Sequence, residues 1–447
     1  MKPVELLQKI FEGGVVGAGG AGFPTHKKLV RGAELLIVNA AECEPLLCSD
    51  RLVMRRYADE IIDGLLAIQR ELEIGRVVIG TKAKYTGEIA ALQKAIAKRD
   101  ARIGIHGVGS FYPAGDEQVL IYEITGKIVP PGGIPIALGI VVINVTTALN
   151  IHDAMGDLPV THKFVTVTGA VHSPAIVRTP VGTAVTECIA AAGGAVFDDY
   201  TIVMGGPMMG KQHPKSREGE LFIGKTDGGI ILLPPNHPLP AFMQKPLEHI
   251  INQAKSVCIQ CSHCTEQCPR YLIGHRLRPN RVMRAIATGT HAESLTEAML
   301  CCECGICELY ACPMLLSPRQ VNMHIKDLIR KGGGKPDPGG INPDQAAMRE
   351  YRRIAQSRLI SRLDLRDYPS HMDNVLEYSP GTVSIALRHG IGRPASPVVV
   401  AGNRVKAGDL IAAVEFDEIG SRIHASIDGV IAAVGDRITI VREEAGT

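Results

Sequence analysis

The chain has 447 residues, more than one hydrophobic core usually contains, which predicts roughly three domains at ~100–200 residues each. Its 48 Lys and Arg nearly balance its 46 Asp and Glu, so no field of one sign indicates a nucleic acid or an anionic membrane as partner. The sequence contains no signal-peptide pattern, and no run approaches the ~18 apolar residues of a membrane span. We therefore expect a soluble, cytoplasmic protein.

The first part of the chain, residues 1–155, is expected to form an α/β domain. It begins with a short amphipathic pattern, MKPVELLQKIFEGG, which predicts a helix that packs onto the same domain. Helical patterns then alternate with short apolar runs rich in branched residues, at 34–40, 76–80, 101–108 and 139–145. This alternation predicts a largely parallel, buried sheet.

The remainder of the chain divides into four segments. Residues 160–240 alternate strand patterns with a short helix and predict a small β-rich module, and residues 245–330 contain most of the cysteines. Residues 331–375 combine a glycine- and proline-rich linker with a helix. Short apolar runs separated by Gly, Asn and Asp turns predict an all-β sandwich or barrel over residues 376–447.

Nine of the twelve cysteines lie between Cys258 and Cys312, and in a chain without an export signal this clustering indicates metal rather than disulfides. Residues 258–269 read C-x2-C-x2-C-x3-C-P, and residues 301–313 carry a second motif of this kind. In the two-cluster ferredoxin pattern the fourth cysteine of each motif binds the other cluster. The sequence thus predicts two four-iron (4Fe-4S) clusters, one held by Cys258, Cys261, Cys264 and Cys312, the other by Cys268, Cys301, Cys304 and Cys307.

The second motif departs from the first in two ways. It has four residues before its last cysteine, and Cys302 stands next to Cys301. The two-residue gap before Cys304 favours Cys301 as the ligand, with Cys302 as a buried neighbour. The alternative is a pair of structural zinc sites, but such sites usually take their ligands from two separated pairs. Three cysteines outside the motifs are expected to be small buried thiols, namely Cys43, Cys48 and Cys188.

A glycine-rich loop, GAGGAGFP at residues 17–24, contains the spacing G-x-G-x-x-G, which is a weak signal by itself. A dinucleotide site needs a strand directly before the loop and an acid about twenty residues after it. Glu42 meets the second condition, whereas a helix precedes the loop. The glycines nevertheless allow backbone N–H groups to approach a phosphate closely.

Four motifs together carry a specific resemblance. GAGGAGFPTHKK (17–28), NAAECEPLLCSDR (39–51), YPAGDEQ (112–118) and INVTT (143–147) resemble the flavin- and NADH-binding domain of the complex I 51-kDa subunit. They are more similar still to the family that contains the Rnf complex C subunit and the cobalamin reductase of propanediol-utilisation microcompartments. FVTVTGAVHSPAIV resembles the soluble-ligand-binding β-grasp module of that family, and IHASIDGVIAAVGDRI its lipoyl-like sandwich-hybrid module.

The resemblance implies an α/β flavin-binding domain, a β-grasp module, a two-cluster ferredoxin-like helical domain and a C-terminal sandwich-hybrid barrel. It also implies that the glycine loop and Lys28 bind the phosphate and ribityl groups of FMN, while further residues line the flavin and the nicotinamide. Ala41 stands where complex I has an acid. The implied cofactor-binding residues are Gly17, Gly19, Gly20, Gly22, Phe23, Lys28, Asn39, Glu42, Glu44, Gly115, Asp116, Glu117, Asn144 and Thr147.

The function implied by the resemblance is electron transfer from NADH through a flavin to iron–sulfur clusters, with no side chain needed as nucleophile or general base. The expected acceptor is the cobalt of a corrinoid (cobalamin). A cobalamin adenosyltransferase or a microcompartment shell is the implied partner. The sandwich-hybrid module follows the cysteine motifs instead of preceding the flavin domain, which favours the reductase. The alternatives are the peripheral electron-input subunit of a membrane Rnf-like pump and a ferredoxin-like carrier with a vestigial flavin site.

Overall fold

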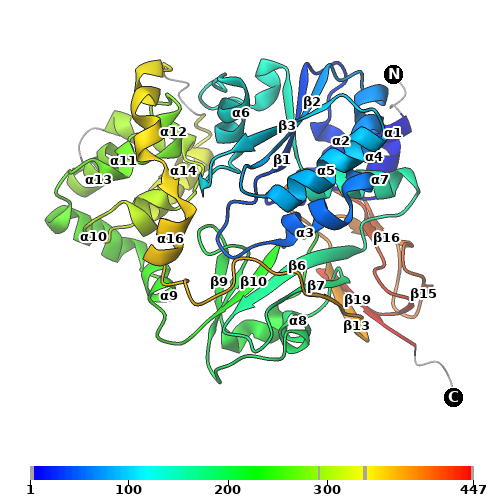
Figure 1. Cartoon of the computed structure of the whole chain (residues 1–447). Helices are drawn as coiled ribbons and strands as arrows, with labels where there is room; N and C mark the ends of the chain where they lie inside the picture. Colours follow the sequence, from blue (N-terminus) through cyan, green and yellow to red (C-terminus); the bar gives the residue numbers. More distant parts are fainter. Residues whose placement is uncertain (1–4, 290–291, 336–339, 444–447) are drawn as a thin grey trace.

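The computed structural model describes residues 5–289, 292–335 and 340–443. The outermost residues of the first and last predicted domains, and residues 336–339 of the predicted linker, lie outside these ranges. Figure 1 shows a helical region on one side of an α/β domain, a second sheet below this domain, and a C-terminal β structure on its other side. Among the described residues, no helix combines the length and the apolar character needed to cross a membrane.

The N-terminal domain is built on a parallel sheet of strand order β3-β2-β1-β5. Each predicted apolar run forms one of its strands, so the α/β prediction is confirmed. The strands are β1 (Leu35–Ala40), β2 (Arg76–Lys82), β3 (Ile103–Val108) and β5 (Ile140–Asn144).

Helices cover both faces of this sheet. The core on one face contains Leu36 and Val38 of β1, together with side chains of α1, α3, α4, α5 and α7. The other face buries Ile37 against α6. These helices are α1 (Glu5–Glu12), α3 (Ser49–Arg56), α4 (Ala58–Glu71), α5 (Thr86–Lys98), α6 (Glu117–Thr125) and α7 (Val145–Met155), and a short α2 (Thr25–Lys28) follows the glycine loop.

The strand order places a topological switch point between β1 and β5. From β1 the chain builds β2 and β3 on one side and then returns to add β5 on the other. Asn39 and Asn144, the last paired residues of β1 and β5, are neighbours at the carboxyl edge. Open α/β sheets bind ligands at such a point.

The second module is a six-stranded sheet of order β12-β7-β6-β10-β8-β9, covered by α8 (Val185–Ala191). Its last strand in sequence, β12, crosses the predicted boundary between the linker segment and the C-terminal module, and it pairs with β7. The strands are β6 (His162–Gly169), β7 (Ala175–Pro180), β8 (Thr201–Met204), β9 (Lys211–Pro214), β10 (Gly229–Leu233) and β12 (Val375–Glu377).

The cysteine segment is helical, and its core joins α10, α13 and α14. The chain then returns to the α/β domain, where β11 (Ile354–Ala355) pairs with β4 (Phe111–Tyr112). The helices of this region are α9 (Pro238–Met243), α10 (Leu247–Val257), α11 (His263–Glu266), α12 (Pro269–Leu272), α13 (Pro279–Thr288), α14 (Pro318–Lys331), α15 (Arg349–Arg352) and α16 (Gln356–Arg362).

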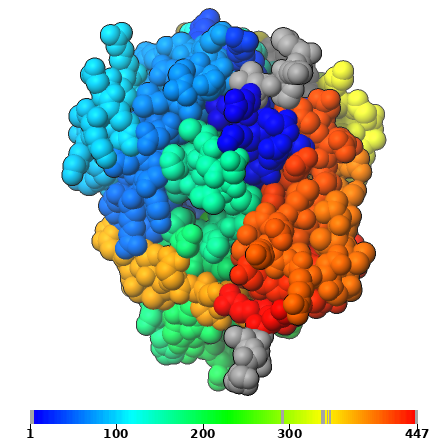
Figure 2. All heavy atoms as spheres, turned by 90° about the vertical axis from the view of Figure 1, so that its right-hand side faces the viewer, coloured from blue at the N-terminus to red at the C-terminus, as the bar shows by residue number. Residues whose placement is uncertain are grey.

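The C-terminal module consists of two small sheets of order β13-β19-β18-β15 and β14-β16-β17, so the all-β prediction is confirmed. Phe11 of α1 belongs to its core, and Figure 2 shows the blue N-terminal helix beside the orange and red barrel. The strands are β13 (Thr382–Ala386), β14 (Ser396–Pro397), β15 (Arg404–Val405), β16 (Leu410–Ala413), β17 (Ile423–His424), β18 (Gly429–Val434) and β19 (Arg437–Val441).

Candidate functional site

The glycine loop lies against the carboxyl edge of the parallel sheet, next to β5 and α7. The backbone N–H of Ala18 donates a hydrogen bond to Thr147 Oγ1 at 3.0 Å. A Cβ added at Gly19 would come within 2.8 Å of Asn144 Nδ2, whereas Gly20 faces open space. Gly19 and Gly20 are exposed. Their backbone can therefore be approached from solvent, as a phosphate site at this edge requires.

Other parts of the loop hold it in place. Gly22 has φ +65° and packs closely against Gly390 of the C-terminal module and Thr226. Buried Lys163 of β6 donates to the carbonyl of Ala18 at 3.1 Å. The loop is thus braced by two other modules and presents its middle to solvent.

Asn39 and Asn144 orient the chain around the switch point. Asn39 Nδ2 donates to the carbonyl of Gly115 at 2.8 Å, and Asn144 caps α7 by accepting from the N–H of Thr146 at 2.8 Å. The structure therefore brings residues of all four predicted motifs to one edge of the sheet.

Asp50 is a residue of this edge that the sequence analysis did not select. Its two carboxylate oxygens accept from Asn144 Nδ2 at 2.7 Å and from Thr146 Oγ1 at 2.8 Å. Asp50 lies inside the quoted motif NAAECEPLLCSDR, but a local pattern does not reveal a contact made across 94 residues.

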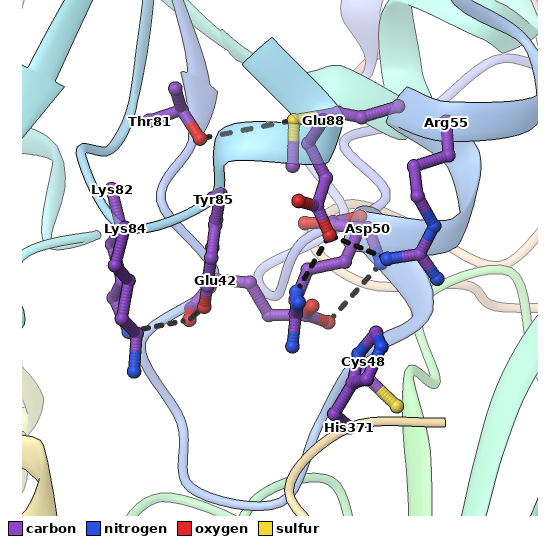
Figure 3. Close-up of polar contacts among 12 residues, drawn as sticks. Glu42, Cys48, Asp50, Arg55, Thr81, Lys82, Lys84, Tyr85, Glu88 and His371 are labelled. Carbon is purple, nitrogen blue, oxygen red and sulfur yellow. Dashed lines mark hydrogen bonds and ion pairs between the residues drawn. The ribbon is translucent and has the colours of Figure 1, made fainter. Parts of the chain in front are cut away.

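Glu42 lies in a polar network at the end of β1, as Figure 3 shows. Its backbone carbonyl accepts from Lys82 Nζ at 3.0 Å, and its Oε1 accepts from the N–H of Asp50 at 3.2 Å. Burial, with the negative charge of Asp50 adding to it, raises the pKa of Glu42 to about 8. Its Oε2 is buried and has no hydrogen-bond partner in the part of the chain that the structure describes. Because buried polar atoms are nearly always paired, this oxygen fits a ligand that supplies a hydrogen-bonding group.

Lys28 and Glu117 were both predicted at the cofactor, and the structure pairs them at 2.7 Å. Both side chains are about one-third exposed. The contact joins α2 to the first turn of α6, so Lys28 lies near the predicted site with its charge already matched. Phe23 of the glycine loop is half-buried.

Glu44 and Asp116 face the cysteine segment. Glu44 accepts from the N–H of Met208 at 2.9 Å and from the hydroxyl of Tyr112 at 3.2 Å, and burial raises its pKa to about 7. Asp116 caps α6 through its Oδ1, while its Oδ2 pairs with Arg270 at 2.9 Å. Both carboxyl groups are thus engaged by protein groups at the boundary with the iron–sulfur segment.

Four of the predicted cluster ligands form what we call the inner cage, namely Cys268, Cys301, Cys304 and Cys307. They line a pocket together with Cys302. The cage contacts the α/β domain, because Tyr112, itself 1% exposed, donates to the carbonyl of Cys304 at 2.8 Å.

The other four predicted ligands form the outer cage, namely Cys258, Cys261, Cys264 and Cys312. All four are half-buried. Burial raises the pKa of Cys264 to about 12, and the charges of its three neighbours add to the effect. Two neutral donors reach the cage, Gln260 Nε2 to Cys258 Sγ at 3.1 Å and the N–H of Leu316 to Cys312 Sγ at 3.3 Å. Hydrogen bonds to cluster sulfurs are one way in which proteins tune such sites.

The donor set fits iron–sulfur chemistry. Soft thiolates favour such clusters, and metal binding deprotonates a coordinating thiol outright. Within the described residues, no three His, Cys, Asp or Glu side chains converge closely enough to hold a single ion. A four-iron cluster instead needs thiolates arranged around a volume, because each binds its own iron, and the inner cage surrounds a cavity of this kind.

The choice between Cys301 and Cys302 stays a prediction, since both side chains line the cavity. Cys301 Sγ accepts from the N–H of Glu303 at 3.3 Å. Of the three cysteines outside the motifs, Cys48 and Cys188 are buried and Cys43 is half-buried.

Known protein families match successive parts of the chain. Four family models match, in chain order. They are the Nuo51 FMN-binding domain (residues 10–153), the SLBB domain (164–212), the 4Fe-4S dicluster domain (257–317) and the RnfC barrel sandwich hybrid domain (370–446). An FMN-binding domain joined to a 4Fe-4S dicluster domain defines an iron–sulfur flavoprotein oxidoreductase.

Relatives that match over nearly the whole chain identify a family within this class of oxidoreductases. The chain is 38% identical to cobalamin reductase PduS of Citrobacter freundii and 39% identical to that of Salmonella typhimurium, over 98% of this chain and 96% of each relative. It belongs to the cobalamin reductase PduS family.

More distant relatives share only part of the chain. In Clostridium ljungdahlii, the C component of the proton-translocating ferredoxin:NAD(+) oxidoreductase complex is 33% identical over 60% of this chain and 56% of its own length. A solved NAD+-reducing [NiFe]-hydrogenase matches with a TM-score of 0.49 at 20% identity, covering 78% of this chain and 66% of that chain. Neither match extends over the whole of this chain.

Proposed function

We propose that this protein takes electrons from NADH on a bound FMN and passes them through two four-iron clusters to the cobalt of a corrinoid. The reaction would reduce cob(III)alamin or cob(II)alamin. The observation that carries the proposal is the 38–39% identity to two cobalamin reductases over 98% of the chain. The order of the four matched modules supports it.

The residues at the carboxyl edge of the sheet would hold the flavin. The exposed backbone of Gly19 and Gly20 would receive its phosphate, while Asn39 and Asn144 orient the surrounding chain. The unpaired Oε2 of Glu42 would form a hydrogen bond with the ring or the ribityl group. FMN, when bound, accepts the two electrons of a hydride and releases them singly, as one-electron clusters require.

The two cages differ in their contacts with the rest of the molecule. The inner cage touches the α/β domain through Tyr112 and Arg270, whereas the outer cage is packed among α10, α13 and α14. We therefore propose that electrons pass from the flavin edge to the inner cage, then to the outer cage and on to the acceptor. No side chain of this route acts as nucleophile or general base.

The partners and the location belong to the same proposal. The acceptor would be a free corrinoid or one carried by a cobalamin adenosyltransferase, and the protein would work in the cytoplasm, inside a microcompartment shell. The second candidate function, an electron-input subunit of a membrane redox pump, is favoured by the relatives from ion-translocating oxidoreductase complexes. Their similarity is limited to 60–62% of this chain.

Anaerobic purification with iron, sulfide and flavin quantified would test the proposal. We expect about eight iron atoms and one FMN per chain. NADH should bleach the flavin and raise the cob(II)alamin absorbance when cob(III)alamin is supplied. A cluster-replete, FMN-bound protein that NADH bleaches but that never reduces a corrinoid would reject the acceptor. Recovery in the membrane fraction with partner subunits would support the second candidate.

A further inference from the structure

Arg270 connects the inner cage to the flavin edge. It follows Cys268 and Pro269 at the start of α12, and it is 8% exposed. Its Nη2 donates to Asp116 Oδ2 at 2.9 Å. Its Nη1 is buried and has no hydrogen-bond partner among the described groups. A buried guanidinium with one unpaired end is costly unless a ligand supplies the missing acceptor.

The paired end of Arg270 leads directly to the predicted flavin site. Asp116 caps α6 by accepting from the N–H groups of Gln118 and Val119, both at 3.1 Å. The carbonyl of the preceding Gly115 accepts from Asn39 at the end of β1. A continuous set of bonds therefore runs from the carboxyl edge of the sheet to Arg270.

The unpaired end of Arg270 belongs to the inner cage. The guanidinium interacts with the thiol of Cys302 both electrostatically and through a side-chain hydrogen bond, and electrostatically with the thiol of Cys268, a predicted ligand. The ion pair with Asp116 is thus a dipole whose positive end meets the cage. A positive charge in this position favours the more reduced and hence more negative state of a cluster, because Coulomb interactions are strong where water is excluded.

We infer that Arg270 is a positioning residue that fixes the inner cage against the flavin edge and raises the reduction potential of the cluster held there. The inference rests on the proposed function, since it needs clusters in both cages. It predicts opposite effects on the reduction potential for the two residues of the Arg270–Asp116 ion pair. Loss of the arginine should lower the potential, whereas loss of the aspartate charge should raise it.

The experiment is a potentiometric titration of the anaerobic, cluster-replete protein, with each cluster followed by its EPR signal. In R270Q, one of the two clusters should become roughly tenfold harder to reduce, a shift of about 59 mV for one electron, and the other should stay unchanged. In D116N, the asparagine still caps α6, since Asn is a good N-cap, and the same cluster should shift in the opposite direction. R270K keeps the charge and should retain most of the potential.

Arg276→Gln is the matched control. Arg276 is a 55% exposed arginine of the same segment that contacts Glu297 at 3.6 Å, and its loss should leave both potentials unchanged. Unchanged potentials in R270Q, equal shifts of both clusters, or shifts of one sign in R270Q and D116N would overturn the inference. If R270Q loses iron, D116N decides: a rise in the potential of one cluster alone supports the inference, and an unchanged or lowered potential overturns it. A wild-type protein without two cluster signals contradicts the proposed function instead.

Discussion

The two cysteine cages have similar sequence motifs but different surroundings. In the inner cage Cys268, Cys304 and Cys307 are buried, and the cage borders the α/β domain. In the outer cage every thiol is half-buried, and Ile259 and Leu315 beside it are exposed apolar residues. One cage therefore faces the predicted flavin edge and the other faces solvent. Burial and neighbours, more than ligand spacing, distinguish the two cages, and under the proposed electron order the inner cage would receive electrons and the outer cage would release them.

The most direct test of this difference between the cages is to remove one predicted ligand from each of them. C304S and C261S should each reduce NADH-dependent corrinoid reduction to background while NADH still bleaches the flavin. In C304S, NADH should no longer reduce the outer cluster. In C261S, NADH should still reduce the inner cluster. EPR after mixing with NADH measures both. C188A, which removes a buried thiol of the β-grasp module, is the control. Reduction of the outer cluster at the wild-type rate in C304S would contradict the proposed order.

A second test concerns Glu44, the half-buried acid that Tyr112 joins to the inner cage. Burial raises the pKa of Glu44 from 4.5 to about 7, so the folded protein holds this proton more tightly than the unfolded chain. Stability should therefore fall as pH rises from 4.5 towards 7. The glutamine of E44Q cannot titrate. The free energy of unfolding of E44Q should therefore fall less over this pH range than that of the wild type, by on the order of a few kcal/mol.

Unfolding midpoints measured at both ends of this pH range would show the difference. Glu34→Gln, which changes an acid that is 74% exposed in the same domain, is the control. An E44Q protein whose stability changes with pH as steeply as that of the wild type would exclude Glu44 as the source.

The comparison also assumes that electrons reach the inner cage from the glycine-loop edge. In G19A the new Cβ would meet Asn144 Nδ2 at 2.8 Å, so the loop or Asn144 must move. We expect FMN affinity to fall about tenfold, which corresponds to about 1.4 kcal/mol. Fluorescence titration of the flavin-free protein measures this. G87A is the matched control, because Gly87 is an exposed residue of α5 in the same domain and a Cβ there meets nothing within 4 Å. Equal losses in the two variants would argue against a phosphate site centred on Gly19.

The smallest expected effect comes from the contact between Tyr112 and Cys304. Y112F removes one buried hydrogen-bond donor and should lower the free energy of unfolding by about 1 kcal/mol, with faster iron loss from the inner cage alone. Release of iron to a chelator, followed by the EPR signal of each cluster, separates the cages. Tyr200→Phe removes a tyrosine–glutamate contact in the β-grasp module and controls for a general loss of stability. Faster loss from the outer cage would contradict the assignment of this contact to the inner one.

Local patterns predicted the elements of the fold well. The apolar runs at 34–40 and 139–145 became β1 and β5 because branched apolar residues between helical patterns suit a buried parallel strand. The cysteine spacing likewise defined two sets of thiols before any geometry was known. Both signals lie within short stretches of the chain.

Contacts between distant segments could not be predicted in this way. The pair of Arg270 with Asp116 joins residues 154 positions apart, and neither has a periodic neighbour that marks the other. The return of β12 to the edge of the β-grasp sheet was likewise missed. Val375–Glu377 is too short to carry a strand pattern, and its place depends on the exposed edge of β7. The ligand assignments and the flavin contacts stay predictions.

The return of the chain after the cysteine motifs has a mechanical consequence. The iron-binding segment begins after β10 and ends at β12, two strands of the same sheet, and β11 fastens it to β4 on the way. It is therefore an insertion whose two ends are held in one sheet, at β10 and β12, and whose middle is held to the α/β domain by the β4–β11 pair. Swinging it away from the flavin domain would require breaking the short β4–β11 ribbon and the Arg270–Asp116 ion pair together. In the proposed electron route, the distance between the flavin edge and the inner cage would therefore be set by architecture rather than by a hinge.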